Sequence, residues 1–414
     1  MNWYRQIDWI TFFLWLTVSL IGLIAIYSAT QGPLHQGTYI QGNFNKQLLY
    51  ICMGVVILII VHFTAPRTFQ QISYLAYGIA LLLSIITIFF GAEVSGERNW
   101  LPIFGFRLQT SEFLKVATIL AVANYLTSRR ENQSGTFRTA LAATLMLFIP
   151  VILIMIQRDT GTALVFMALI PIMLLWSGVP YGLCLLMVSP VIIGYLTVID
   201  YVWGLIAAIA ITAVFFFLEK KPLFTFGTFL ASIIIVIGVQ VGLNDILQPH
   251  QRARVESFAN PALDPRGAGW NVMQAKTAIG SGGINGKGFM QGTQTQLRFL
   301  PEQSTDFIFC VIGEEGGFLS TSLVLFLVAL LLLRLLAQAA THKHPFAQLF
   351  IVGGCSIYLI HVVINLGSAL GLMPVIGLPL PFLSYGGSSF LANTIILGIC
   401  MNFYYHQRDF SIYS

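Results

Sequence analysis

Residues 9–29, WITFFLWLTVSLIGLIAIYSA, form an apolar run that contains no charged residue. A helix of about 20 such residues crosses the roughly 30 Å hydrocarbon core of a bilayer. The run is longer than the apolar part of a signal peptide and many similar runs follow it, so we interpret it as a retained membrane span. The composition agrees: 57% of the 414 residues are hydrophobic and 9% are charged, which is more apolar surface than a soluble domain could bury.

Eleven further apolar runs follow, and together with the first they predict about twelve transmembrane helices. We therefore expect an all-α polytopic membrane protein, in which residues 1–414 form a single integral membrane domain. Residues 244–305, between the ninth and tenth helices, are expected to form a large loop with broken helices. The further runs lie near residues 47–65, 72–92, 111–127, 138–156, 161–177, 181–199, 202–218, 225–243, 306–337, 346–372 and 388–404.

The positions of the basic residues predict an orientation for these helices. Lys and Arg close to the end of a span resist translocation, so the short loops that carry them are usually cytoplasmic. On this basis we expect both termini inside, and the loops near 30–46, 93–110, 244–305 and 373–387 outside. The cations that mark the inner side are Arg5, Arg67, Arg129, Arg130, Arg138, Lys220, Lys221, Arg334, Lys343 and Arg408. The outer loops carry as many basic residues, but these cluster among glycines and carboxylates, which suggests an anionic ligand on the outer face.

Several classes of site are not expected from this sequence. The net charge of +5 is ordinary for a membrane protein, and no basic, aromatic-interleaved surface suggests nucleic acid. All five cysteines lie in apolar runs without metal-ligand spacing, so we interpret them as small core residues. The histidines form no HExxH or similar pattern. A dedicated His or Cys metal site is therefore not predicted.

A polar, glycine-dense stretch interrupts the apolar chain at residues 260–312. Its turns at 280–283 and 286–288 could approach phosphate groups through backbone amides, although they lack the spacing of a nucleotide P-loop. Further along, residues 377–387 contain two prolines, so this segment cannot be a regular helix and must be shielded by protein or line a cavity.

Charged residues inside or beside the predicted spans are the next candidates. Glu112 and Lys115 are three residues apart, hence on one helix face, and form either a structural ion pair or part of a site. Asp159 either caps the helix that begins near residue 161 or lines a site. Asp306 is expected to cap the following span, whereas the carboxylates at 314–315 have no assigned role.

Five motifs occur in an order that resembles the SEDS family, the shape, elongation, division and sporulation polymerases of the bacterial cell wall. The resemblance covers about residues 10–405, and the wording of the glycine-rich block is similar to the rod-elongation members. The motifs are GERNWL at 96–101, QTSE at 109–112, QRDTGT at 157–162, the block at 264–312 and PLPFLSYGGS at 379–388.

The resemblance implies an inverting peptidoglycan glycosyltransferase for cell-wall elongation. It would join lipid II units into glycan strands and release undecaprenyl pyrophosphate on the outer side of the bacterial cytoplasmic (inner) membrane. The implied partners are a class B penicillin-binding protein, which is a transpeptidase, and other membrane proteins of the elongation machinery. Family members usually have ten helices, so residues 201–243 are interpreted as an inserted helical hairpin.

Asp264 is the predicted catalytic residue. The attacking sugar hydroxyl is a poor nucleophile and needs a carboxylate that takes its proton. The essential loop aspartate of the family maps onto Asp264, in the sequence LDPRGAGW, where a proline and two glycines permit tight turns beside a bulky ligand. Outside this motif series, Asp-Pro-x-Gly would be interpreted simply as a turn.

The leaving pyrophosphate is already stable as an anion, so the enzyme needs cations rather than a second carboxylic acid. Arg98, Lys115, Arg158, Lys276 and Lys287 could supply them. The family more often has arginine at the position of Asn99, and Arg98 could carry that charge instead. A divalent cation, Mg²⁺ or Mn²⁺, could share the task, and no other cofactor is expected.

Four further residues complete the predicted substrate site: Trp100, Glu112, Asp159 and Ser384. Trp100 could pack on a sugar or lipid, although tryptophan at a membrane boundary is also typical of the aromatic belt. Two other functions stay open. A lipid-precursor flippase or transporter would depend on charges near the membrane midplane. A scaffold of the elongation machinery would leave Asp264 dispensable.

Overall fold

The structure is a computed structural model that describes residues 8–32, 39–94, 96–103, 106–133, 137–241 and 268–407. Each of the twelve predicted runs forms a long helix, which confirms the all-α polytopic fold. In the described ranges, nine helices are long and apolar enough to cross a membrane, and α6 is equally apolar but shorter. The twelve are α1 (Trp9–Gln31), α2 (Asn43–Phe63), α3 (Pro66–Phe90), α4 (Thr110–Gln133), α5 (Phe137–Ile156), α6 (Thr160–Trp176), α7 (Tyr181–Ile199), α8 (Tyr201–Glu219), α9 (Pro222–Val241), α13 (Ile308–Thr341), α14 (Pro345–Ala369) and α15 (Gly387–Tyr405).

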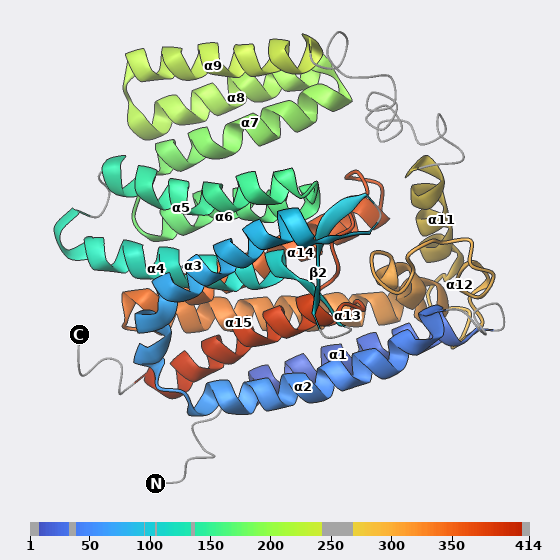
Figure 1. Ribbon diagram of the computed structural model, residues 1–414. Helices are drawn as coiled ribbons and strands as arrows, with labels where there is room; N and C mark the ends of the chain where they lie inside the picture. Colours follow the sequence, from blue (N-terminus) through green and yellow to red (C-terminus); the bar gives the residue numbers. More distant parts are fainter. Residues whose placement is uncertain are drawn as a thin grey trace.

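Helix α14 forms the centre of the bundle and packs against α4, α6, α13 and α15 (Figure 1). Helices α1 and α2 cover one side. On the opposite side α7, α8 and α9 pack mainly on one another, and α7 joins this layer to α6. The predicted hairpin, α8 with α9, therefore lies at the periphery, and its status as an insertion stays a prediction.

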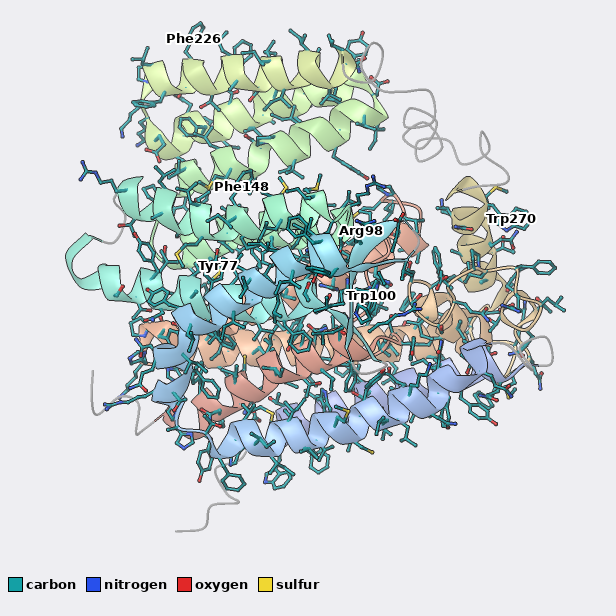
Figure 2. The ribbon with its side chains drawn as sticks, in the orientation of Figure 1. Tyr77, Arg98, Trp100, Phe148, Phe226 and Trp270 are labelled. Atoms are coloured by element: carbon teal, nitrogen blue, oxygen red, sulfur yellow. The ribbon has the colours of Figure 1, made fainter. Side chains whose placement is uncertain are left out.

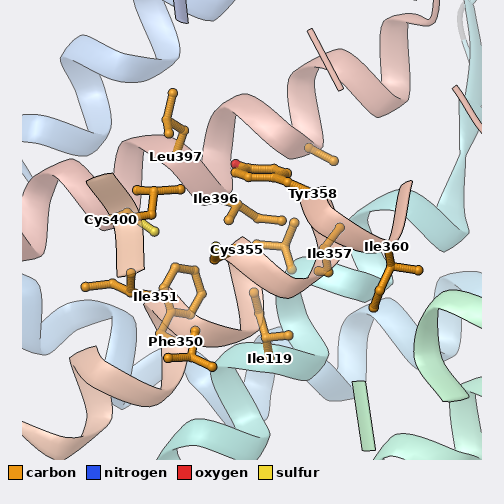
Figure 3. Packing of buried hydrophobic residues seen from close by; sticks show 14 of the residues in the cluster. Ile119, Phe350, Ile351, Cys355, Ile357, Tyr358, Ile360, Ile396, Leu397 and Cys400 are labelled. Atoms are coloured by element: carbon orange, nitrogen blue, oxygen red, sulfur yellow. The ribbon is translucent and has the colours of Figure 1, made fainter. Parts of the chain in front are cut away.

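The core is built where α4, α14 and α15 meet (Figure 3). Ile119, Phe350 and Cys400, one from each helix, are all completely buried. Because lipid is as apolar as these side chains, close packing and interhelical hydrogen bonds hold such helices together. One of these bonds runs from the Tyr358 hydroxyl on α14 to the Asn393 carbonyl on α15, at 2.7 Å. Among the cysteines, four are buried as predicted, but Cys52 is exposed on α2, which corrects that prediction.

The two ends of the bundle differ in chemistry. At one end Asp8 caps α1 and its carboxylate lies 3.1 Å from the Arg334 guanidinium of α13, which in turn lies over the Tyr404 ring of α15. At the other end the Ser28 hydroxyl of α1 donates to Glu315 at 2.6 Å. The helix ends that carry Asp8 and Tyr404 therefore lie opposite the end where the polar loops gather.

The predicted loops at this second end contain more regular structure than expected. Between α3 and α4 the chain forms a three-stranded antiparallel sheet in the order β1-β2-β3, with Trp100 opposite Ala92 and Gln109. The stretch after α14, residues 370–386, is irregular, as its prolines predict, and it is buried mainly between Leu378 and Ser384. The new elements are β1 (Ala92–Val94), β2 (Glu97–Ile103), β3 (Phe106–Gln109), the 3-10 helix η3 (Tyr39–Gly42), α11 (Ala268–Ser281) and α12 (Thr293–Gln296).

Candidate active site

Asp264, the predicted catalytic base, lies outside the described residues, and so does the first part of the predicted catalytic loop. The description resumes with α11, which begins at Ala268, four residues after Asp264. The other predicted site residues all lie within the described residues.

Asp159 is the N-cap residue of α6 and the centre of a hydrogen-bonded cluster. Its carboxylate accepts from the backbone amide and the hydroxyl of Thr162, both at 2.9 Å. The side-chain amides of Asn99 and Gln109 also donate to it, at 2.9 and 3.3 Å. The same Asn99 amide donates to Glu97 at 2.8 Å. The cap therefore fixes β2 and the end of β3 onto α6, and a substrate contact by Asp159 stays a proposal.

Arg98 and Trp100 lie on β2, toward the end of the bundle where Trp270 of α11 is found (Figure 2). The Arg98 guanidinium is exposed and lies 3.8 Å from Glu93, a surface pair of little energetic weight. Arg158 is also exposed and adopts a left-handed φ of 65° at the turn before α6. Two cationic side chains thus stand at the rim of the buried Asp159 cluster.

Two carboxyl groups near this cluster hold their protons more tightly than usual. Burial, and then the charge of Asp159, raise the pKa of Glu97 to about 7. Burial, and then the charge of Glu302, raise the pKa of Asp306 to about 7. The prediction that Asp306 caps α13 is wrong, because Phe307 is the N-cap residue and no side chain caps the helix there. The Asp306 carboxylate instead faces Gly377 of the irregular segment.

The raised pKa of Glu97 predicts a pH-dependent stability. The folded protein binds this proton more tightly than the unfolded chain, so the stabilisation is present below pH 4.5 and is lost as the pH rises through about 7. Glu97→Gln imitates the protonated form, so the thermal unfolding midpoint of this variant should depend less on pH across this range. Glu93→Gln, at an exposed position, is the control and should keep the wild-type profile. Equal pH slopes for Glu97→Gln and wild type would contradict the assignment.

Glu112 and Lys115 form the predicted buried ion pair, with 2.9 Å between carboxylate and ammonium. The structure adds a third member, because His361 Nε2 of α14 lies 2.9 Å from Lys115 Nζ. His361 Nδ1 lies 3.0 Å from the Pro379 carbonyl in the irregular segment. A carbonyl can only accept, so Nδ1 carries the proton and Nε2 accepts from Lys115. The triad therefore joins α4 and α14 to residues 370–386.

Ser384 is buried within the same irregular segment. Its hydroxyl accepts from the Leu380 amide at 2.9 Å and donates to the Thr305 carbonyl at 2.6 Å. Asn365 of α14 donates to the carbonyls of Asp306 and Leu378, at 2.8 and 2.7 Å. These bonds fix the segment against the residues that precede α13, and any substrate contact by Ser384 stays a proposal.

Lys287 contacts the buried carboxylate of Glu314, to which the sequence assigned no role. Its ammonium lies 2.8 Å from Glu314 Oε1, and Glu314 is completely buried in α13. The same carboxylate accepts from the amides of Gln294 and Thr295 at 2.8 and 2.9 Å, and from the Thr295 hydroxyl at 2.8 Å. Glu314 thus caps α12 with a negative charge, which the exposed amides of a helix start favour. Its role is to hold the glycine-dense loop.

The glycines of this loop permit a close approach to α13. The amides of Lys287 and Gly288 donate to the carbonyls of Glu314 and Glu315, both at 3.0 Å. A methyl group at Gly286 would lie 2.1 Å from the Glu315 carbonyl oxygen, so no larger residue fits. The Gly286 amide is bonded as well, to Gly282. These three amides already donate hydrogen bonds within the protein, which argues against the predicted phosphate contact by the 286–288 turn.

We predict that Glu314→Gln loosens this loop. The change removes the ion pair to Lys287 and turns a side-chain amide toward the amides of Gln294 and Thr295. Hydrogen bonds to a charged group contribute about 1.5–3 kcal/mol, so exchange of these two amides with solvent should become at least about tenfold faster. Hydrogen-exchange mass spectrometry measures this, with the exposed Glu302→Gln as control. Unchanged protection in Glu314→Gln would contradict the role.

The predicted residues fall into two groups. Asp159, Glu112, Lys115 and Ser384 are connected through α4, α6, α14 and the irregular segment, with Arg98 and Trp100 at the rim. Lys287 lies apart, beside α13. Lys276 lies on the exposed side of α11 and covers Gly371, where an added methyl group would lie 2.7 Å from its ammonium.

No metal site can be assigned to the part of the chain that the structure describes. There, no group of three or more His, Cys, Asp or Glu side chains could hold a metal ion.

The comparisons with known proteins agree along the whole chain. The family profile FTSW_RODA_SPOVE, described as Cell cycle protein, matches residues 8–222 and 200–409. The chain belongs to this family. It is 33% identical to the peptidoglycan glycosyltransferase RodA of Treponema pallidum, covering 95% of this chain and 96% of that protein. It is 32% identical to the peptidoglycan glycosyltransferase MrdB of Escherichia coli, covering 89% and 88%. The predicted family and glycosyltransferase activity are confirmed.

Solved structures of the family share the fold. A chain from a peptidoglycan synthase complex, studied for the coordination of polymerization and crosslinking, superposes with a TM-score of 0.74 at 26% identity, covering 97% of this chain and 98% of that one. The crystal structure of the Rod shape determining protein RodA of Thermus thermophilus gives 0.63 at 25% identity, with the same coverage.

Proposed function

We propose that this chain polymerises lipid II into glycan strands during cell-wall elongation and releases undecaprenyl pyrophosphate. The observation that carries the proposal is the similarity to RodA of Treponema pallidum over 95% of the chain. The buried polar clusters at one end of the bundle support it, because a lipid-linked substrate presents its pyrophosphate at the membrane surface.

In the proposed mechanism Asp264 takes the proton of the acceptor sugar hydroxyl as that oxygen attacks the anomeric carbon of the donor. The bond to the pyrophosphate breaks on the opposite side, so the configuration inverts. Exposed cations neutralise the departing pyrophosphate, and Arg98, Arg158 and Lys276 are the candidates with exposed side chains. Lys287 and Lys115 are each bound to a carboxylate, so their contribution would require that pair to open.

A reconstituted assay tests the function. The purified protein, with its transpeptidase partner, is supplied with lipid II, and glycan strands are followed by gel electrophoresis. Strand formation in protein shown to be free of contaminating polymerase would support the proposal. Movement of lipid II across the vesicle membrane without strand formation would favour the flippase. The absence of both activities would favour the scaffold.

We propose that the protein lies in the bacterial inner membrane with both termini in the cytoplasm. The partners proposed from the family are a class B penicillin-binding protein and other membrane components of the elongation machinery. The synthase complex that contains the structural neighbour supports an assembly of polymerising and crosslinking proteins.

Single cysteines in a Cys-free variant test the orientation. Thr277→Cys on α11 and Lys221→Cys between α8 and α9 are both at exposed positions, and these two elements lie toward opposite ends of the bundle (Figure 1). An impermeant maleimide should label position 277 in intact cells, after outer-membrane permeabilisation where one exists, and spare position 221 until the cells are lysed. The reverse pattern would invert the topology.

A further inference from the structure

Helix α13 is broken at Gly317, whose φ of 67° and ψ of −165° are not helical. A break frees the amides of the residues that follow it, and these need new acceptors. The outer loop supplies them: the Phe318 amide donates to the Gly283 carbonyl at 2.9 Å, and the Leu319 amide donates to the Ile284 carbonyl at 3.2 Å. The turn after α11 therefore caps the second half of α13 and is fixed to it.

The depth of this turn follows from the helix. Arg334, which pairs with Asp8 at 3.1 Å, marks the opposite end of the apolar part of α13. Phe318 precedes Arg334 by sixteen residues, or about 24 Å along a helix axis. The hydrocarbon core is roughly 30 Å thick. Gly283 and Ile284 are therefore held close to the far edge of the hydrocarbon.

The turn presents large apolar side chains at this level. Ile284 and Phe289 are 68% and 54% exposed, although neither belongs to a spanning helix. They adjoin the outward side of the bundle: Ile284 is bonded beside Phe318 and Leu319, which are 66% and 59% exposed, and Phe289 stacks on Tyr27 of α1 at 6.2 Å. The apolar surface of the spans thus continues onto the loop.

Several backbone groups of the turn already have hydrogen-bond partners within the protein, as a position beside lipid requires. Irregular backbone can lie at the hydrocarbon only where its polar groups are satisfied by protein. The carbonyls of residues 283–284 accept from α13, and the amides of residues 286–288 are bonded to Gly282, Glu314 and Glu315.

We propose that residues 283–289 form an interfacial anchor that inserts Ile284 and Phe289 among the acyl chains of the adjacent leaflet, which is the outer leaflet in the proposed orientation. Lipid is the occupant because the patch continues the outward apolar surface of α13 at the hydrocarbon edge. The anchor holds α11 at the membrane surface.

Nitroxide accessibility tests the anchor without an activity measurement, so its failure is separate from failure of the proposed function. Full-length Cys-free protein is labelled at Ile284→Cys or Phe289→Cys, with Thr277→Cys on exposed α11 as the matched control. The protein is placed in vesicles of phosphatidylethanolamine and phosphatidylglycerol. The nitroxides at 284 and 289 should collide more often with oxygen than with a water-soluble nickel chelate. The nitroxide at 277 should show the opposite order. Nickel accessibility at 284 and 289 equal to that at 277 would overturn the proposal. In that case a partner protein, rather than lipid, would be the occupant of the patch in cells.

Discussion

Asp264→Asn should lower glycan synthesis by roughly 10² or more, the scale that loss of a general base usually produces. Asparagine keeps nearly the same shape but cannot accept the proton of the acceptor hydroxyl. The variant should still insert and bind its partner, because the change removes one charge from a loop. The rate of strand formation from lipid II, in protein free of contaminating polymerase, is the measurement.

The matched control for this variant is Asp159→Asn. Asp159 caps α6 and accepts four hydrogen bonds, so its loss should lower the thermal unfolding midpoint as well as the activity. Asp264→Asn should lower activity alone. Near wild-type synthesis by Asp264→Asn would refute the general base and leave the polymerase function in place.

The spans could be predicted from sequence because length and apolarity alone define them. The run predicted at 181–199 is α7 as observed, and the broken stretch at 377–387 followed from its prolines. The sheet between α3 and α4 could not be predicted, since its strands have three to seven residues and carry charges. No alternation long enough to signal a strand exists there.

In the candidate site, contacts between residues close in sequence could be predicted, and contacts between distant residues could not. The pairing of Glu112 with Lys115 could be predicted because three residues separate them on one helix. His361 completes that cluster from 246 residues away, and Lys287 reaches Glu314 across 27 residues. Such contacts depend on how the helices pack, which an apolar pattern does not specify. The break at Gly317 could not be predicted either, because it lies inside an apolar run and depends on contacts with the 283–284 turn.

Lys115→Met should be among the most destabilising single changes in this protein. It leaves the Glu112 carboxylate, 1% exposed, without its counter-charge, and breaking a buried pair in this way typically costs about 3–5 kcal/mol. It also removes the donor to His361 Nε2. The thermal unfolding midpoint in detergent should fall, together with the yield of folded protein.

The double change Glu112→Gln with Lys115→Met separates structure from chemistry. It removes both charges, so most of the lost stability should return. Exchanging the two charges should restore less, because a carboxylate at position 115 would face His361 Nε2, which is an acceptor while Nδ1 donates to Pro379. If the pair contributes to the substrate site, the well-folded double variant should still synthesise little glycan. Full synthesis by that variant would reduce the pair to a structural role, and the proposed chemistry would then depend on Asp264 and the exposed cations.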